Sequence, residues 1–123
     1  MSRYIYYNIN PEGETLPDCV CRAISLATNI DYYRVEELLE FVGDYYCCED
    51  LCVSCYSNLI ENIFGFQVFD ANGMKVSELS DMYPNDILLI RINSHLTCSI
   101  CGLLLDIWNC LDEEADIYWI VER

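Results

Sequence analysis

The hydrophobic and polar positions follow two different periods along the chain. Between residues 18 and 63, apolar side chains recur every three or four positions, which is the period of an amphipathic helix. From residue 86 onward, short aliphatic and aromatic runs are separated by turn residues, as is typical of strands. We predict a helix over Asp18–Thr28, a helix capped by Asp31 and ended by Gly43, a helix over Ser54–Ile63, a short helix capped by Ser77 and closed by Pro84, and strands over Tyr4–Ile9, Phe66–Phe69, Ile87–Ile92, His95–Ile100, Leu103–Trp108 and Ile117–Val121.

This order of elements predicts the fold class. Helices come first and antiparallel strands follow, which favours an α+β domain with its helices on one side of a small antiparallel sheet. A chain of 123 residues is long enough for one domain with its own core. We see no internal repeat, so residues 1–123 are expected to form a single domain.

The helix over Asp18–Thr28 places a cysteine at its positive end. Asp18 is of the type that caps helix N-termini, and Pro17 keeps the preceding chain extended. Cys19 lies at the margin of the apolar stripe, whereas Cys21 is expected on the opposite, polar side together with Ser25 and Thr28. Unpaired N–H groups and the helix dipole favour thiolate over thiol at this end. Cys19 is therefore a candidate nucleophile, although a cysteine taken alone is more often a small core or surface residue.

The second candidate feature is the hairpin that turns over Cys101-Gly102. Pairing back from this turn places His95, the only histidine, opposite Trp108, and Thr97 opposite Asp106. Asp106 is then a diagonal neighbour of His95 on the same face, roughly 7 Å away. A carboxylate there can fix the tautomer of the imidazole and leave its other nitrogen to a thiol. Trp108 would cover the pair from water.

Charge and hydropathy limit the partners. Six Lys and Arg stand against twenty-one Asp and Glu, a formal net charge of -15. Such a surface repels phosphate backbones and anionic lipid, so we expect no nucleic-acid and no membrane partner, and a basic peptide or protein would be attracted. No apolar run approaches the roughly 20 residues of a membrane span and no signal peptide is visible, so a cytoplasmic protein is expected. We expect no cofactor.

Nine cysteines is a high count for this length. The number is odd and no export signal is visible, which favours reduced thiols over a disulfide framework. Cys52-x-x-Cys55 and Cys98-x-x-Cys101 have the spacing of zinc-ribbon ligands, but Cys98 is predicted in a strand core and Cys101 in a turn. A second, local candidate for zinc is the set Cys47, Cys48, Cys52 and Cys55, in which the adjacent pair is geometrically awkward.

These residues resemble a known family, the small papain-like cysteine peptidase domains of bacteriophage and bacterial genomes, which are distant relatives of bacteriocin-leader peptidases. DCVCRAISLAT is similar to the family's first motif, an acidic or polar residue, Cys, two residues, Arg-Ala and an aliphatic helix. The strand DILLIRI, His95, Gly102, the segment LDIWN and the last strand IYWIV match further features of the family. The resemblance extends from roughly residue 5 to the C-terminus.

The resemblance implies a papain-like fold and roles for three residues. Cys19 would be the nucleophile, His95 its general base and later its acid, and Asp106 the residue that orients the imidazole. Two positions depart from the family pattern. The Gln that usually precedes the cysteine and donates to the oxyanion is missing, so that Asn8 or Asn10 would have to replace it, and Ser94 stands where the family often has Gly.

Three classes of function follow. The first is a cysteine hydrolase or acyl transferase with a Cys-His-Asp triad, acting on peptide or isopeptide bonds of a peptide or protein substrate. The second is a weak or inactive papain-fold binding protein, for example a phage protein that engages a host or virion partner, in which case the compartment is the host cytoplasm. The third is a small interaction module stabilised by zinc.

Overall fold

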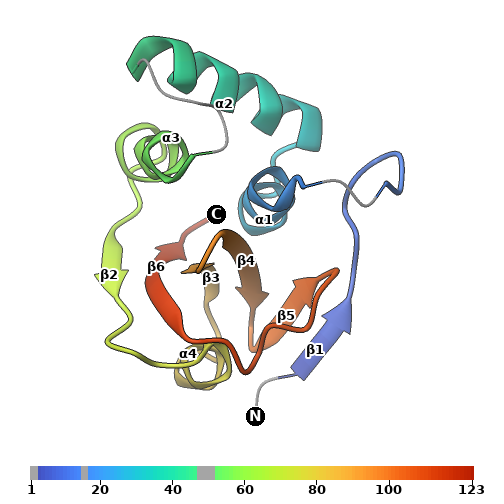
Figure 1. Cartoon of the computed structure of the whole chain (residues 1–123), viewed down its shortest axis with the longest axis vertical. Coiled ribbons are helices and arrows are strands. Elements are labelled where there is room, and N and C mark those ends of the chain that lie inside the picture. Colours follow the sequence, from blue (N-terminus) through green and yellow to red (C-terminus); the bar gives the residue numbers. More distant parts are fainter. Residues whose placement is uncertain (1–2, 15–16, 47–51) are drawn as a thin grey trace.

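The computed structural model describes residues 3–14, 17–46 and 52–123. In these residues the chain is an α+β fold built on one curved, six-stranded sheet with strand order β1-β5-β4-β3-β6-β2 (Figure 1). The strands are β1 (Arg3–Tyr6), β2 (Val68–Asp70), β3 (Ile87–Ile92), β4 (His95–Ile100), β5 (Leu103–Asp106) and β6 (Ala115–Val121), and the helices are α1 (Cys19–Thr28), α2 (Tyr32–Tyr46), α3 (Val53–Asn58), which continues into a π-helical turn over Leu59–Ile63, and α4 (Val76–Met82).

Sequence pattern located the central strands well because their turns are local. The hairpin β4–β5 turns at Cys101-Gly102, both with positive φ, and pairs Ile100 with Leu103 as predicted. A second two-residue turn, Asn93-Ser94, joins β3 to β4, since Ile92 pairs with His95. In the turn over Cys101-Gly102, both central residues have positive φ. A two-residue turn of this kind fits the right-handed twist of the strands that it connects.

The sheet is not purely antiparallel. β1 pairs with β5 in parallel, with Arg3 opposite Leu103 and Tyr6 opposite Asp106. Strand β1 therefore lies at an edge of the sheet, and it leads into the loop before α1. The remaining pairs are antiparallel, so the sheet is mixed.

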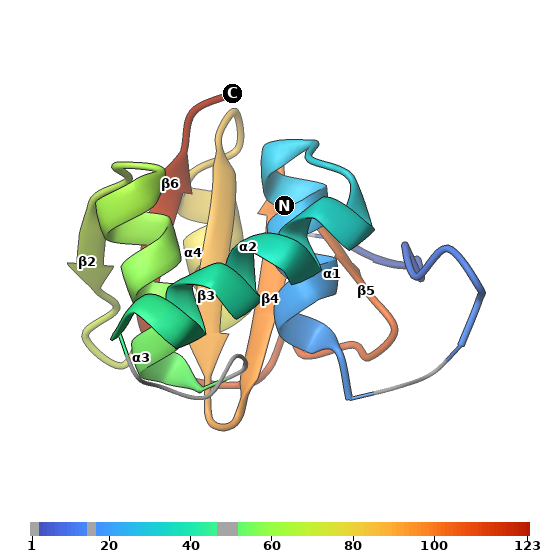
Figure 2. The same cartoon turned by 90° about the horizontal axis from the view of Figure 1, so that it is seen from above.

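The helices cover both faces of the sheet, which corrects the expectation that they share one side. Helices α1, α2 and α3 pack over one face around Leu89, Leu96 and Trp119 (Figure 2). Helix α4 packs on the other face, where Val76 and Leu79 meet Leu88, Ile90 and Leu104. The run ILLIRI explains this arrangement, because it is apolar on both sides of the strand and needs a cover on each.

Helix α1 is buried around most of its circumference. Val20, Ala23, Ile24 and Ala27 are buried as predicted, but Cys21 and Ser25 are buried too, so the expected polar side is wrong for them. Packing of α2 over α1 covers this side, and the Ser25 hydroxyl donates to the carbonyl of Ile30. The helix is held between the sheet and α2.

Other boundaries differ from the sequence pattern where packing outweighs local signals. Gly43 does not end α2, which continues to Tyr46 with Gly43 buried. Ser77 lies inside α4, which begins after Lys75, and the Glu78 carboxylate accepts from the Lys75 backbone N–H. Ile63 is 47% exposed rather than buried. Strand bounds also differ: β1 spans Arg3–Tyr6, β2 spans Val68–Asp70, β5 ends at Asp106, and β6 begins at Ala115.

No helix in the described part of the chain is long and apolar enough to cross a bilayer.

Candidate active site

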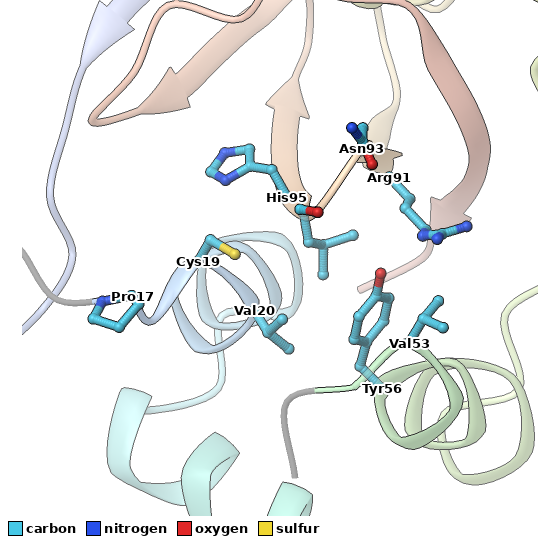
Figure 3. Close-up of a pocket in the computed structure, with 10 residues that line it drawn as sticks. Pro17, Cys19, Val20, Val53, Tyr56, Arg91, Asn93 and His95 are labelled. Atoms are coloured by element: carbon cyan, nitrogen blue, oxygen red, sulfur yellow. The ribbon is translucent and has the colours of Figure 1, made fainter. Parts of the chain in front are cut away.

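The first turn of α1 and the first residue of β4 meet beside the open end of the β4–β5 hairpin. Cys19 is the first residue of α1 and is half-buried, and His95 is the first residue of β4. Both residues line one pocket together with Val20, and Figure 3 shows the His95 ring on the same side as the Cys19 sulfur (Figure 3). The first-turn N–H groups of α1 have no acceptor within the helix, so the sulfur lies at a positive helix end.

His95 has a partner on each side of its ring. Its Nε2 lies 2.6 Å from Oδ2 of Asp106, and the Cys19 thiol is close enough to raise the pKa of the imidazole. Because Nε2 is used by the carboxylate, the Nδ1 side of the ring is left for the sulfur. The structure therefore brings together Cys19, His95 and Asp106, the three residues that the sequence singled out, in that order.

Asp106 ends β5 and has four donors. Its Oδ2 accepts from His95 and from the Thr97 hydroxyl at 2.7 Å, and its Oδ1 accepts from the Ile107 backbone N–H at 2.7 Å and from Arg22 Nη1 at 3.4 Å. The contact with Thr97 agrees with the predicted register, which placed the two residues opposite each other. Burial raises the pKa of Asp106, but the hydrogen bonds from His95 and Thr97 outweigh it, and the pKa is lowered.

The electrostatics favour a thiolate–imidazolium pair. Burial raises the pKa of Cys19, but hydrogen bonds from His95 and from the Leu96 backbone, with the positive charges of His95 and Arg22, lower it below its ordinary value. Burial lowers the pKa of His95, whereas hydrogen bonds to Asp106 and Cys19 raise it, for a net value of about 9. With a pKa of about 9, the His95 ring holds its proton near neutral pH, and its positive charge favours the thiolate form of Cys19.

Trp108 lies over the imidazole, where the sequence expected a shield. The two rings are 5.1 Å apart between centroids in an edge-to-face arrangement. The indole itself is 44% exposed, so it covers His95 from the solvent side.

The pocket in front of Cys19 has a volume of about 550 Å³. Val20, Val53 and Leu96 give it apolar walls, and Tyr56 and Arg91 give it a polar end (Figure 3). Burial raises the pKa of Tyr56 to about 12, although the positive charge of Arg91, which pairs with Asp116, acts in the opposite direction. The reacting groups thus open onto a space large enough for part of a chain-like ligand.

The structure does not bring Asn8 and Asn10 to this pocket. The Asn8 amide donates to the carbonyl of Glu14 at 2.8 Å, and the buried Asn10 amide donates to Asp18 Oδ2 at 3.0 Å and to the Tyr32 hydroxyl at 3.4 Å. These amides donate to the loop before α1 and to α2, so neither is placed to donate to an oxyanion in the pocket.

Asp18 also differs from its predicted role. It precedes α1, but its side chain makes no capping hydrogen bond to the helix backbone. Its carboxylate instead accepts from Arg22 Nε at 2.8 Å and from the Tyr32 hydroxyl at 2.6 Å. These charged and hydroxyl donors compete with the backbone for the same oxygens.

Sequence reasoning missed two residues of this region. Asn93 lines the pocket from the turn before His95, and the Asn-Ser pair between two apolar strands was a local signal for that turn. Arg22 had no comparable signal as a site residue, because its contact with Asp106 joins positions 84 residues apart.

The structure addresses only part of the zinc predictions. Cys47 and Cys48 lie outside the described residues. Within the described ranges the four thiols of the two Cys-x-x-Cys pairs do not gather into a ligand group, and Cys101 is exposed in the hairpin turn. Cys52 instead accepts from the Cys55 backbone at the start of α3.

One set of potential metal ligands does converge among the described residues, namely His95, Asp106 and Cys110. Cys110 is buried, and burial raises its pKa to about 12, so it is a thiol rather than a thiolate ligand. The short contact between His95 and Asp106 is already a hydrogen bond. These three residues therefore fit a site in which the groups are protonated and hydrogen-bonded better than they fit a metal site.

Comparisons with protein-family models, with curated proteins and with solved structures find no match for this chain.

Proposed function

We propose that the protein is a cysteine hydrolase or acyl transferase that acts on peptide or isopeptide bonds through Cys19, His95 and Asp106. The observation that carries the proposal is the row of neighbouring side chains Cys19, His95 and Asp106, with a 2.6 Å hydrogen bond between the last two, set at a helix N-terminus and open to a pocket. A nucleophile, a base and an orienting group within hydrogen-bond reach are what covalent acyl transfer needs.

The proposed reaction begins with attack of the Cys19 thiolate on the substrate carbonyl carbon. The new C–S bond forms as the carbonyl π electrons move to oxygen, and first-turn N–H groups of α1 stabilise that oxyanion. Collapse of the intermediate expels the amine, which takes its proton from the His95 imidazolium. His95 then removes a proton from water, or from an acceptor amine, which attacks the thioester and releases Cys19.

The environment of the site favours certain substrates. The formal charge of -15 attracts a basic peptide or protein segment, while the pocket walls beside Cys19 accept apolar groups. A nucleophile at a helix start, with its histidine and aspartate on a β-hairpin, also agrees with the resemblance to papain-like peptidases of bacteriophage and bacteria. In a phage protein the reaction would take place in the host cytoplasm.

One observation favours a second candidate, a binding protein with a weak site. Neither Asn8 nor Asn10 supplies a side-chain donor to the oxyanion, and loss of one such donor costs about 2.7–4 kcal/mol of transition-state stabilisation. In that case the pocket and acidic surface would bind a basic partner without efficient turnover.

Acylation of Cys19 separates the two candidates. The full chain is incubated with a mixture of activated peptide esters, and the modified residue is identified by mass spectrometry. An acyl group that forms on Cys19 and is released by water or amine supports the enzyme. The control is Cys101→Ser, which removes an exposed thiol and is expected to change nothing. Acyl groups spread over exposed thiols, with Cys19 unmodified, would leave only the binding protein.

A further inference from the structure

Arg22 occupies an unusual position for one of only six basic residues in the chain. It lies on α1 one turn after Cys19 and is 5% exposed. Its Nε donates to Asp18 at 2.8 Å and its Nη1 lies 3.4 Å from Asp106 Oδ1. The guanidinium is therefore buried between two carboxylates, one at the start of its own helix and one at the end of β5.

Each of these carboxylates is held by further donors. Asp18 accepts from Asn10 and Tyr32, so it is fixed by the loop before α1 and by α2. Asp106 accepts from His95, Thr97 and the Ile107 backbone, all of which belong to the β4–β5 hairpin or follow it directly. Arg22 is the one donor to Asp106, among the contacts of the described residues, that comes from the helix carrying Cys19.

We propose that Arg22 is a positioning residue, whose guanidinium fixes the Asp106 carboxylate relative to α1 and thereby sets the His95 ring against the Cys19 sulfur. This inference rests on the function proposed above. Without Arg22 the helix and the hairpin would be joined by packing and by the Cys19–His95 contact itself. The planar fork suits the task because its two nitrogens reach two carboxylates in a fixed geometry.

The buried charges support the same role. Arg22 offsets the negative charges of Asp18 and Asp106, and the Tyr32 hydroxyl donates to Asp18 from α2. Its positive charge also contributes to the lowered pKa of Cys19. Removing it would leave two buried carboxylates near each other with one fewer partner, which is strongly unfavourable.

The test compares Arg22→Lys and Arg22→Gln with the wild-type chain. The rate of carboxamidomethylation of Cys19 by iodoacetamide is measured against pH by mass spectrometry. We expect a lowered rate near neutral pH, about tenfold for each unit by which the Cys19 pKa rises. Because His95 is the only histidine, its ring N–H resonances give a second readout. The downfield proton shared with Asp106 is expected to shift upfield or broaden in both variants.

The matched control is Arg34→Lys on α2, where the guanidinium pairs with Glu37 and the side chains are 64% and 66% exposed. It is expected to change neither readout. Asp18→Asn keeps Arg22 in place with Asp106 as its charged partner, so the His95 proton and the Cys19 profile are expected to persist. If both Arg22 variants unfold, the Asp18→Asn variant provides the test.

The outcomes are distinct. Folded Arg22→Lys and Arg22→Gln proteins with the wild-type Cys19 profile and His95 spectrum would overturn the positioning role while leaving the proposed function intact. Loss of both signals in folded Asp18→Asn would also overturn it, because the positioning would then belong to Asp18. A wild-type Cys19 that reacts no faster than the exposed Cys101 would instead contradict the proposed function itself.

Discussion

Two cysteines that lie near opposite ends of the α1–β4 contact show how differently this fold treats the same side chain. Cys19, at the start of α1, has a lowered pKa, whereas burial raises the pKa of Cys98, within β4, to about 12. Burial acts in the same direction on both sulfurs. The difference comes from donors, because Cys19 receives hydrogen bonds from His95 and the Leu96 backbone, while Arg123 only partly offsets burial at Cys98.

The same contrast separates two regions of the sheet, the end where β4 begins and β5 ends, and the part beneath α4. In the first region, the charged groups of Arg22 and His95 converge on one carboxylate, Asp106. Beneath α4, the polar groups are neutral hydroxyl pairs, Ser80 with Ser99 and Tyr83 with Tyr118, each at 2.7 Å. Neutral pairs satisfy each other and serve packing, whereas a buried cluster of charges with shifted pKa values is typical of a reactive site.

The largest effect is expected from His95→Ala. It removes both the hydrogen bond that favours the Cys19 thiolate and the proton donor for the leaving amine, so acylation should fall by about 10²–10⁴-fold. Transfer of an activated peptide ester to Cys19 measures the change. An unchanged acylation rate would mean that the reactivity of Cys19 does not depend on His95.

Asp106→Asn should have the next largest effect. The neutral amide keeps the shape of the carboxylate but no longer stabilises the imidazolium, so the His95 pKa should fall below about 9 and the Cys19 pKa should rise. Each unit of that rise lowers the thiolate fraction near neutral pH about tenfold. Alkylation rates for the variant and the wild type test this, and a faster Cys19 in the variant would contradict it.

Cys19→Ala is expected to shift the titration of His95 without unfolding the chain. The thiol contributes a hydrogen bond and a negative charge that raise the ring pKa, so the pKa should move down from about 9. NMR titration of the single histidine measures the shift. A ring that titrates identically with and without the sulfur would show that the two groups do not interact.

The smallest effect on reactivity is expected from Ser99→Ala, beneath α4. The change leaves the Ser80 hydroxyl buried without its partner, which should lower the free energy of unfolding by about 1–3 kcal/mol. The alkylation rate of Cys19 should not change. A loss of Cys19 reactivity in the folded variant would mean that the region beneath α4 and the region around Asp106 are coupled, which would contradict this contrast.

Sequence pattern succeeded where the determinants are local. The hairpin register followed from a turn whose two residues adopt positive φ, and this register placed His95 and Asp106 on one face. The margin position of Cys19 followed from the helical period. These local features gave the His95–Asp106 pair, whereas the pairing of Cys19 with His95 was expected from the family resemblance and not from a local signal.

The rest depended on contacts between distant segments. Gly43 lies inside α2 rather than at its end, and Cys21 lies against a second helix rather than in solvent, because tertiary packing outweighs local propensity. The partners of Asp18 could not be foreseen, since Tyr32 and Arg22 compete with the helix backbone for its oxygens. The position of Asn10 next to Asp18 likewise removes it from the pocket.

The pH dependence of Cys19 alkylation in the wild type and in His95→Ala tests the thiolate–imidazolium pair most directly. The wild type should show a first rise below the ordinary thiol pKa of 9.0, as Cys19 ionises, and a second change at about 9, as His95 loses its proton. His95→Ala should show a single rise at higher pH. A single rise near the ordinary thiol pKa in both proteins would contradict the pair, and with it the proposed reaction.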